Sequence, residues 1–166
     1  MGIYEPNDSS NFGNQRNMKT QTTTKPKPEQ LVLEFFDRVW HAPHELDAID
    51  DLMAENYRIT TAGTTITGRD NFKNWIQKFQ KLLLEAKTEN IELFFNEAEN
   101  KVVSRWVCSG KNNGILDLPP DGQFVSFTGI AIWTIKNNKL SECWVERSAF
   151  ELYKQLTSNE GGKRFV

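Results

Sequence analysis

The chain has 166 residues and a formal net charge of −2, with 38% hydrophobic and 25% charged residues. This length and composition fit one globular domain with an ordinary core. Because the first 28 residues hold more basic than acidic side chains, the remainder is more acidic still, which disfavours nucleic-acid binding. No run of 18 apolar residues occurs, so we expect no membrane-spanning helix and no membrane partner.

The cysteine and histidine content points away from disulfide and metal scaffolds. Two cysteines, Cys108 and Cys143, are too few for a disulfide framework, so we expect a reduced, cytoplasmic protein. Two histidines, His41 and His44, stand without a cluster of further ligands, so no metal site is predicted.

Residues 1–28 are polar, with almost no apolar side chain to bury, and predict a disordered tail. The folded domain is expected over residues 29–158, followed by a flexible tail at 159–166. Within the domain, residues 31–40 carry a broad apolar stripe at helical spacing, and Pro43 should end that helix.

A short helix follows at residues 46–53, and the Thr-rich segment 57–67 reads as a strand or hairpin. Apolar residues between Phe72 and Ala86 predict a third helix. Thr67 is placed to cap its start, with Asp70 three residues later as in a capping box.

The period then changes to that of strands, which we expect at residues 91–96, 102–110, 124–135 and 140–147. Asn137 and Asn138 tolerate positive φ and predict a two-residue hairpin turn between the last two strands. A short final helix should contain Phe150, Tyr153 and Leu156. Helices followed by an antiparallel meander predict an α+β fold, in which a curved sheet packs against the helices and leaves a cavity between them.

The hairpin turn predicts which side chains share a face. If Asn137 and Asn138 form the loop, the following pairs lie on one face: Ile135–Leu140, Trp133–Glu142, Ala131–Trp144, Gly129–Glu146 and Phe127–Ser148. That face mixes aromatic side chains with carboxylates. It is either a solvated sheet surface or the wall of a pocket whose few polar groups orient a ligand.

Four segments resemble the SnoaL-like polyketide cyclases of the nuclear-transport-factor-2-like superfamily. They are Phe36-Asp37-Arg38-Val39-Trp40, followed by a short helix and Tyr57; Val102-Val103-Ser104-Arg105-Trp106; the Gly110 to Val125 connection with Pro119-Pro120; and Ser141-Glu142-Cys143-Trp144 with Gln155-Leu156. Their order and spacing span residues 31–156.

The resemblance implies a cone-shaped, curved, mixed or antiparallel sheet wrapped around about three N-terminal helices, with a short C-terminal helix. Family cyclases close a polyketide ring by intramolecular aldol addition, without metal or cofactor, using an aspartate in the last strand. Members often form homodimers through the outer sheet face. Non-catalytic binding and scaffolding domains share the architecture.

This chain departs from the family pattern at three positions. Ser148 stands where the family carries its aspartate, and Thr60 and Asn112 stand where histidines are common. Ser148 is also a candidate helix cap, with Glu151 three residues later. We therefore hypothesise that Glu146 supplies the missing acid/base, assisted by Ser148, the alternative being a surface glutamate or one paired with Arg105 or Arg147.

The predicted ligand is a hydrophobic, oxygenated small molecule. The residues expected to bind it are Trp144, Trp133, Phe127, Trp106, Glu142, Tyr57 and Asn112. The sequence thus predicts a cofactor-independent cyclase- or isomerase-type enzyme. The alternative is a non-catalytic ligand-binding or dimerising domain of the same superfamily.

Overall fold

The structure, a computed structural model, describes residues 27–158 except residues 97 and 99. The predicted tails, 1–28 and 159–166, fall outside that range apart from Lys27 and Pro28. In chain order the elements are α1 (Pro28–Phe35), the π-helical turn η1 (Phe36–Trp40), α2 (Ala48–Leu52), β1 (Met53–Thr61), β2 (Thr64–Thr67), α3 (Arg69–Leu82), β3 (Leu83–Phe95), β4 (Lys101–Asn112), the 3₁₀ turn η2 (Ile115–Asp117), β5 (Phe124–Lys136), β6 (Lys139–Arg147) and α4 (Ala149–Thr157).

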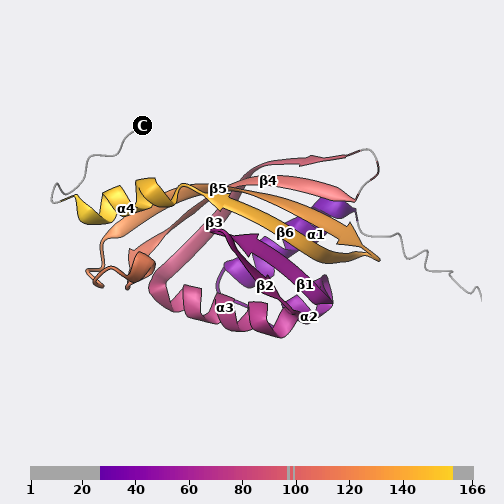
Figure 1. Ribbon diagram of the computed structural model, residues 1–166, viewed down its shortest axis with the longest axis horizontal. Helices are drawn as coiled ribbons and strands as arrows, with labels where there is room; N and C mark the ends of the chain where they lie inside the picture. Colours follow the sequence, from indigo (N-terminus) through magenta and orange to yellow (C-terminus); the bar gives the residue numbers. More distant parts are fainter. Residues whose placement is uncertain (1–26, 97, 99, 159–166) are drawn as a thin grey trace, which may run out of the picture.

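The strands form one six-stranded sheet in the order β2-β1-β6-β5-β4-β3. β1 runs parallel to β6, whereas every other neighbouring pair is antiparallel. The sheet is curved and open, and it arches over α1, α2 and α3, which all lie on its concave side (Figure 1). The predicted α+β architecture, with a mixed, curved sheet around the N-terminal helices, is confirmed.

The hydrophobic core lies between the concave face and these helices. α1 contributes Leu31, Val32 and Phe35, all buried, because apolar residues three and four apart fall on one side of the helix. Strands β4 and β5 alternate buried and exposed residues along most of their length. This alternation gives the sheet one inner face against the helices and one outer face.

The two ends of α3 differ from the sequence prediction. Gly68, with φ of 93°, occupies the N-cap position, and Thr67 makes no side-chain cap. At the other end the helix stops at Leu82, and Leu83 begins β3, paired with Asn112. Asn113 donates to the carbonyls of Lys81 and Leu82, which satisfies two groups that a helix end leaves unpaired.

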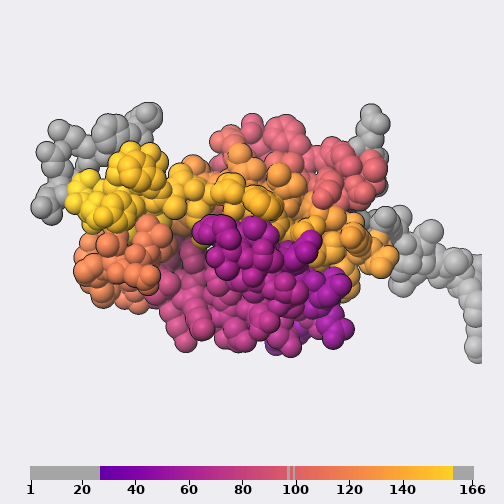
Figure 2. All heavy atoms as spheres, in the orientation of Figure 1, coloured from indigo at the N-terminus to yellow at the C-terminus, as the bar shows by residue number. Residues whose placement is uncertain are grey.

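The β5–β6 turn forms as predicted. Asn137 and Asn138 have φ of 50° and 58°, and Lys136 pairs with Lys139. Beyond β6, α4 extends past the helical layer and lies against the segment that precedes β5 (Figure 2). Gln155 holds it there, because its side chain donates to Ser126 O and its carbonyl accepts from Gln123.

Cys108 and Cys143 are both buried and unbonded to each other, on β4 and β6, with β5 between them. A strand therefore separates the two thiols. Across the described part of the chain, no helix is both long enough and apolar enough to cross a bilayer.

Candidate functional site

A β-bulge at Ser141 decides which residues of β6 face the helices. Ile135 pairs with Leu140 as predicted, but the next pair is Thr134 with Glu142, which leaves Ser141 without a partner. The Ser141 hydroxyl donates to Thr134 O at 3.0 Å. One extra residue in a strand moves all later side chains to the opposite face. The predicted pairing is therefore wrong by one residue from Glu142 onward.

The three predicted site residues of β6 consequently lie on the outer face. Trp144 pairs with Ile132 instead of Ala131, and 52% of its surface is exposed. Its indole Nε1 donates to Glu146 Oε1 at 2.8 Å. Glu142 forms an ion pair with Arg58 of β1. Glu146 does not share a face with Trp133, and its carboxylate is engaged with Trp144.

Ser148 ties the end of β6 to β5. Its Oγ lies 3.0 Å from Thr128 N and accepts that hydrogen bond, and its own N–H donates to Thr128 O. It occupies the N-cap position of α4, yet its side chain makes no cap bond. The predicted capping box is therefore wrong, and the predicted pairing with Phe127 is shifted to Thr128.

The surroundings of Asn112 explain it without a ligand, whereas the Tyr57 hydroxyl is buried with no hydrogen-bond partner among the described residues. The Asn112 side chain donates to Pro119 O and Asp121 Oδ1 and accepts from the N–H groups of Gly114 and Ile115. It thus organises the loop that follows β4. Tyr57 is fully buried against Phe72, with ring centroids 4.9 Å apart, and burial raises the pKa of its hydroxyl.

An aromatic cavity lies between the inner face of the sheet and the helices, with a volume of about 50 Å³ that water-sized groups can occupy. This space holds a few water molecules, so a larger ligand requires the side chains of the wall to move. Its helical wall consists of Phe35, Phe36, Trp40, Phe72, Trp75 and Phe79. Its sheet wall consists of Ile59, Thr88, Trp106, Cys108, Phe127, Ala131, Trp133, Val145 and Arg147. Three predicted ligand-binding residues, Trp106, Phe127 and Trp133, are thus brought together.

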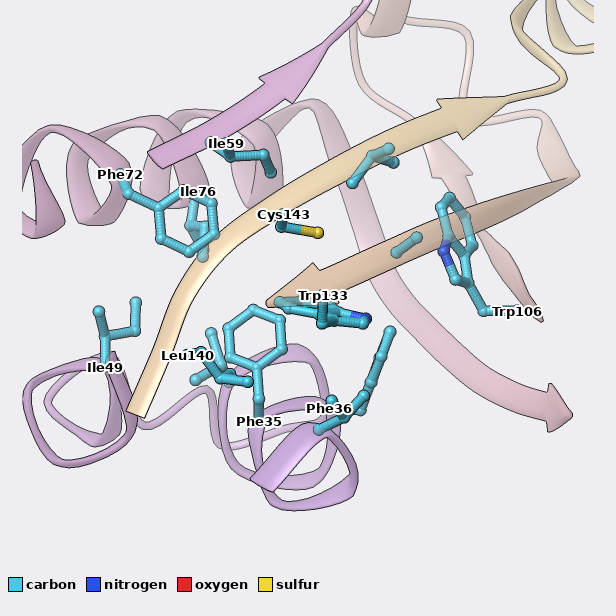
Figure 3. Close-up of a cluster of buried hydrophobic side chains, with 14 of the residues drawn as sticks. Phe35, Phe36, Ile49, Ile59, Phe72, Ile76, Trp106, Trp133, Leu140 and Cys143 are labelled. Carbon is cyan, nitrogen blue, oxygen red and sulfur yellow. The ribbon is translucent and has the colours of Figure 1, made fainter. Parts of the chain in front are cut away.

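Two local features fix the indoles of the sheet wall. Trp133 is buried next to Phe35 and Phe36 (Figure 3), and its Nε1 donates to the buried Ser104 hydroxyl at 3.0 Å. Trp106 lies flat over its cross-strand partner Gly129, where an added Cβ would come within 2.1 Å of the indole. The glycine is therefore required for the ring to take this position.

Arg147 is the charged member of the lining. The bulge turns it inward with Cys143 and Val145, whereas sequence reasoning had placed these three residues on the face away from Trp133. Its guanidinium carbon lies 5.9 Å from the Trp75 ring centroid and 5.7 Å from that of Phe79. Burial lowers its pKa from the ordinary arginine value.

Cys108 lines the cavity, and both Cys108 and Cys143 are buried. Burial is the main cause that raises the pKa of both Cys108 and Cys143. Because the thiolate is the nucleophilic form, neither residue is suited to covalent chemistry. Within residues 27–158, with 97 and 99 set aside, no group of three or more His, Cys, Asp or Glu side chains is placed to hold a metal ion.

The sequence model of the SnoaL-like polyketide cyclases matches residues 30–156. This chain belongs to that family. No curated protein sequence matches it significantly, but many solved structures share the SnoaL-like fold.

A candidate SnoaL-like polyketide cyclase from Jannaschia sp. CCS1 superposes with a TM-score of 0.74 at 16% identity, covering 89% of this chain and all of that one. TsrD from Streptomyces laurentii gives 0.67 at 22% identity, with 78% and 93% covered. IdmH from Streptomyces antibioticus, a candidate polyketide cyclase, gives 0.69 at 15% identity, with 80% and 100% covered. At these identities the likeness is one of fold.

The observed cavity therefore differs from the predicted site in its charged side chain, which is Arg147 instead of Glu146. The sequence did hold a signal for the inward position of Arg147. Cys143 and Val145 alternate with Trp144 and Glu146 in the way that buried and exposed residues alternate along a strand. That alternation, followed on to Arg147, places the arginine inward. The hairpin register gave the opposite answer because it assumed an unbroken ladder.

Proposed function

We propose that this SnoaL-like protein binds a flat, hydrophobic small molecule in the aromatic cavity. The observation that carries the proposal is the composition of the wall. Nine of its fifteen lining residues are Phe or Trp, and these residues come from the helices and from strands β4 and β5 of the sheet. Aromatic walls hold flat apolar molecules by burial and ring contact, and a few polar groups set the orientation.

The same wall favours binding over proton transfer. Among the described lining residues, none has a carboxylate or an imidazole, the groups that most often act as general acid or base. Glu146 contacts Trp144 on the outer face, and Ser148 is bonded to Thr128. We therefore place the non-catalytic function ahead of the cyclase function, which is the reverse of the order given by the sequence.

A cyclase- or isomerase-type activity is the second candidate, because the chain belongs to a family of polyketide cyclases. In an aldol ring closure a C–C bond forms, and a proton moves from the attacking carbon to the new alkoxide. Arg147 is a cation in the cavity that could stabilise the enolate and alkoxide oxygens. An isomeric product that accumulates from a polyketide-type diketone, and is lost in Arg147→Met, would promote this candidate to first place.

Binding is tested with 2-naphthamide, a flat neutral probe, by quenching of tryptophan fluorescence. Ala131 is buried in the cavity wall, so Ala131→Phe should fill the space and weaken binding at least tenfold. Val107→Phe places the same ring on the outer face of β4 and serves as the matched control. Equal binding by both variants, with both shown to be folded by circular dichroism, would reject the cavity as the binding site.

We also propose that the outer face of the sheet pairs with a second copy of the chain. Phe94, Val103, Ile132 and Trp144 are cross-strand neighbours in one row over β3, β4, β5 and β6. Phe94, Ile132 and Trp144 are 60%, 44% and 52% exposed. A contiguous apolar row of this kind is typical of protein interfaces. Sedimentation analysis should show a dimer that Ile132→Glu converts to a monomer, and a monomeric wild type would reject the proposal.

A further inference from the structure

Arg147 has donors that the protein does not use. One terminal nitrogen, Nη2, donates to Thr61 Oγ1 at 2.8 Å. The Nε nitrogen is removed from solvent and has no hydrogen-bond partner among the described residues. A buried donor without a partner costs free energy, so such a group in a cavity wall is a sign of a missing acceptor.

The charge of Arg147 is also unmatched. The other described arginines each have a carboxylate within ion-pair distance: Arg38 with Glu34, Glu45 and Asp51; Arg58 with Glu142; Arg69 with Asp50; and Arg105 with Glu92. Arg147 has no such partner in the part of the chain that the structure describes. The neighbouring carboxylate in sequence, Glu146, points to the outer face and is bonded to Trp144.

The surroundings of Arg147 hold its guanidinium in place. The hydroxyl of Thr61 bonds one end, and the rings of Trp75 and Phe79 lie within 6 Å on the α3 side. Burial disfavours the charged form and lowers the pKa of Arg147, yet arginine stays protonated at neutral pH. A fixed cation with free N–H donors inside an aromatic cavity suits an anionic oxygen at the edge of a flat ligand.

We propose that the cavity selects flat hydrophobic molecules that carry a carboxylate, and that Arg147 binds this group through Nε and a further N–H. The inference rests on the proposed binding function and adds the substrate class. The carboxylate supplies both the missing acceptor and the missing negative charge. The aromatic walls bury the hydrocarbon body of the same molecule.

The test compares 2-naphthoate with 2-naphthamide at pH 7, since the two probes have nearly the same shape and differ in charge. The wild type should bind the acid about tenfold or more tightly than the amide, as expected for a charge-assisted hydrogen bond in a buried site. Arg147→Met should bind both probes with similar affinity. Arg105→Met, which removes an outer-face arginine, should keep the preference for the acid.

The outcomes separate this inference from the proposed function. Equal binding of acid and amide by the wild type overturns the inference and leaves the binding function intact. A preference for the acid that persists in Arg147→Met also overturns it. Failure of both probes to bind the wild type rejects the binding function itself. Equal binding of the two probes by the wild type overturns the inference even where Arg147→Met does not fold.

Discussion

The two faces of the β5–β6 hairpin are built from alternate residues of the same two strands, yet their chemistry differs. The inner face carries Trp133, Cys143, Val145 and Arg147, which meet the aromatic cavity or the core. The outer face carries Ile132, Trp144 and Glu146, which are exposed. A carboxylate and an arginine adjacent in sequence thus have opposite surroundings. The identity of the functional group depends on the position of one bulge residue, Ser141.

Deletion of Ser141 should have the largest effect on the two faces of the hairpin. Without the extra residue, β6 would pair in the unbroken register and turn Glu142 and Glu146 toward the core. Burial of an unpaired carboxylate costs several kcal/mol. Two of them together cost about the whole free energy of unfolding of a small domain. We expect the variant to lose its cooperative unfolding transition in calorimetry. A native-like transition would show that the bulge does not determine the two faces.

Two tryptophans of the hairpin sharpen the comparison. Trp133 is 2% exposed and bonded to Ser104, so Trp133→Ala should cost about 3–5 kcal/mol in urea unfolding. Trp144 lies on the outer face, and Trp144→Ala should cost less than about 1 kcal/mol. A larger loss at Trp144 should depend on protein concentration if this face forms a dimer. Equal losses that are independent of concentration would contradict the assignment of the faces.

Gly129 tests how tightly the inner face is packed. A methyl group there would overlap the Trp106 indole, so Gly129→Ala should destabilise the protein by about 1–3 kcal/mol. Trp106→Leu in the same chain removes the overlap and should make the glycine replacement nearly neutral. A double-mutant cycle measures this coupling. Additive effects of the two changes would indicate that the ring does not lie over Gly129.

The thiols of the inner face predict a smaller effect with pH. Burial raises the pKa of Cys108 and Cys143 in the folded state, whereas unfolded thiols ionise near pH 8.5. The contribution of the two thiols to the free energy of unfolding is therefore fully present below that pH. Above it the free energy of unfolding falls by up to about 1.4 kcal/mol per pH unit for each thiol. Urea unfolding from pH 8 to 10 should show this slope. The Cys108→Ala/Cys143→Ala double variant should show a shallower one, and an unchanged slope would contradict the burial effect.

The periodicity of the sequence predicts most of the fold because strong local signals agree with the final packing. The Asn137-Asn138 turn, the strands β4 and β5, and the apolar stripe of α1 are all found where expected. The end of α3 is missed because Leu83 and Ala86 continue a helical spacing while they lie in β3, where Leu83 pairs with Asn112. Over such a short run, helical and strand patterns cannot be distinguished by period alone.

The candidate site is only half predictable from the sequence. Trp106, Phe127 and Trp133 belong to long alternating strands, so their inward position follows from the pattern. Glu146 lies on the outer face and Arg147 on the inner face, the reverse of the prediction, because no strong sequence signal marks the bulge at Ser141. The helical wall formed by Phe72, Trp75 and Phe79 was predicted as a helix face, but its distance from Arg147 depends on tertiary packing.

The central claim is that the ligand enters the inner face, and the five tryptophans test it in one experiment. Four of them, Trp40, Trp75, Trp106 and Trp133, line the cavity, and Trp144 lies on the outer face. Each indole N–H gives a separate signal in a ¹H–¹⁵N spectrum, assigned by single Trp→Phe variants. On addition of 2-naphthamide the account predicts shifts of the cavity indoles with an unchanged Trp144 signal. A shift confined to Trp144, with the cavity indoles unchanged, would contradict it.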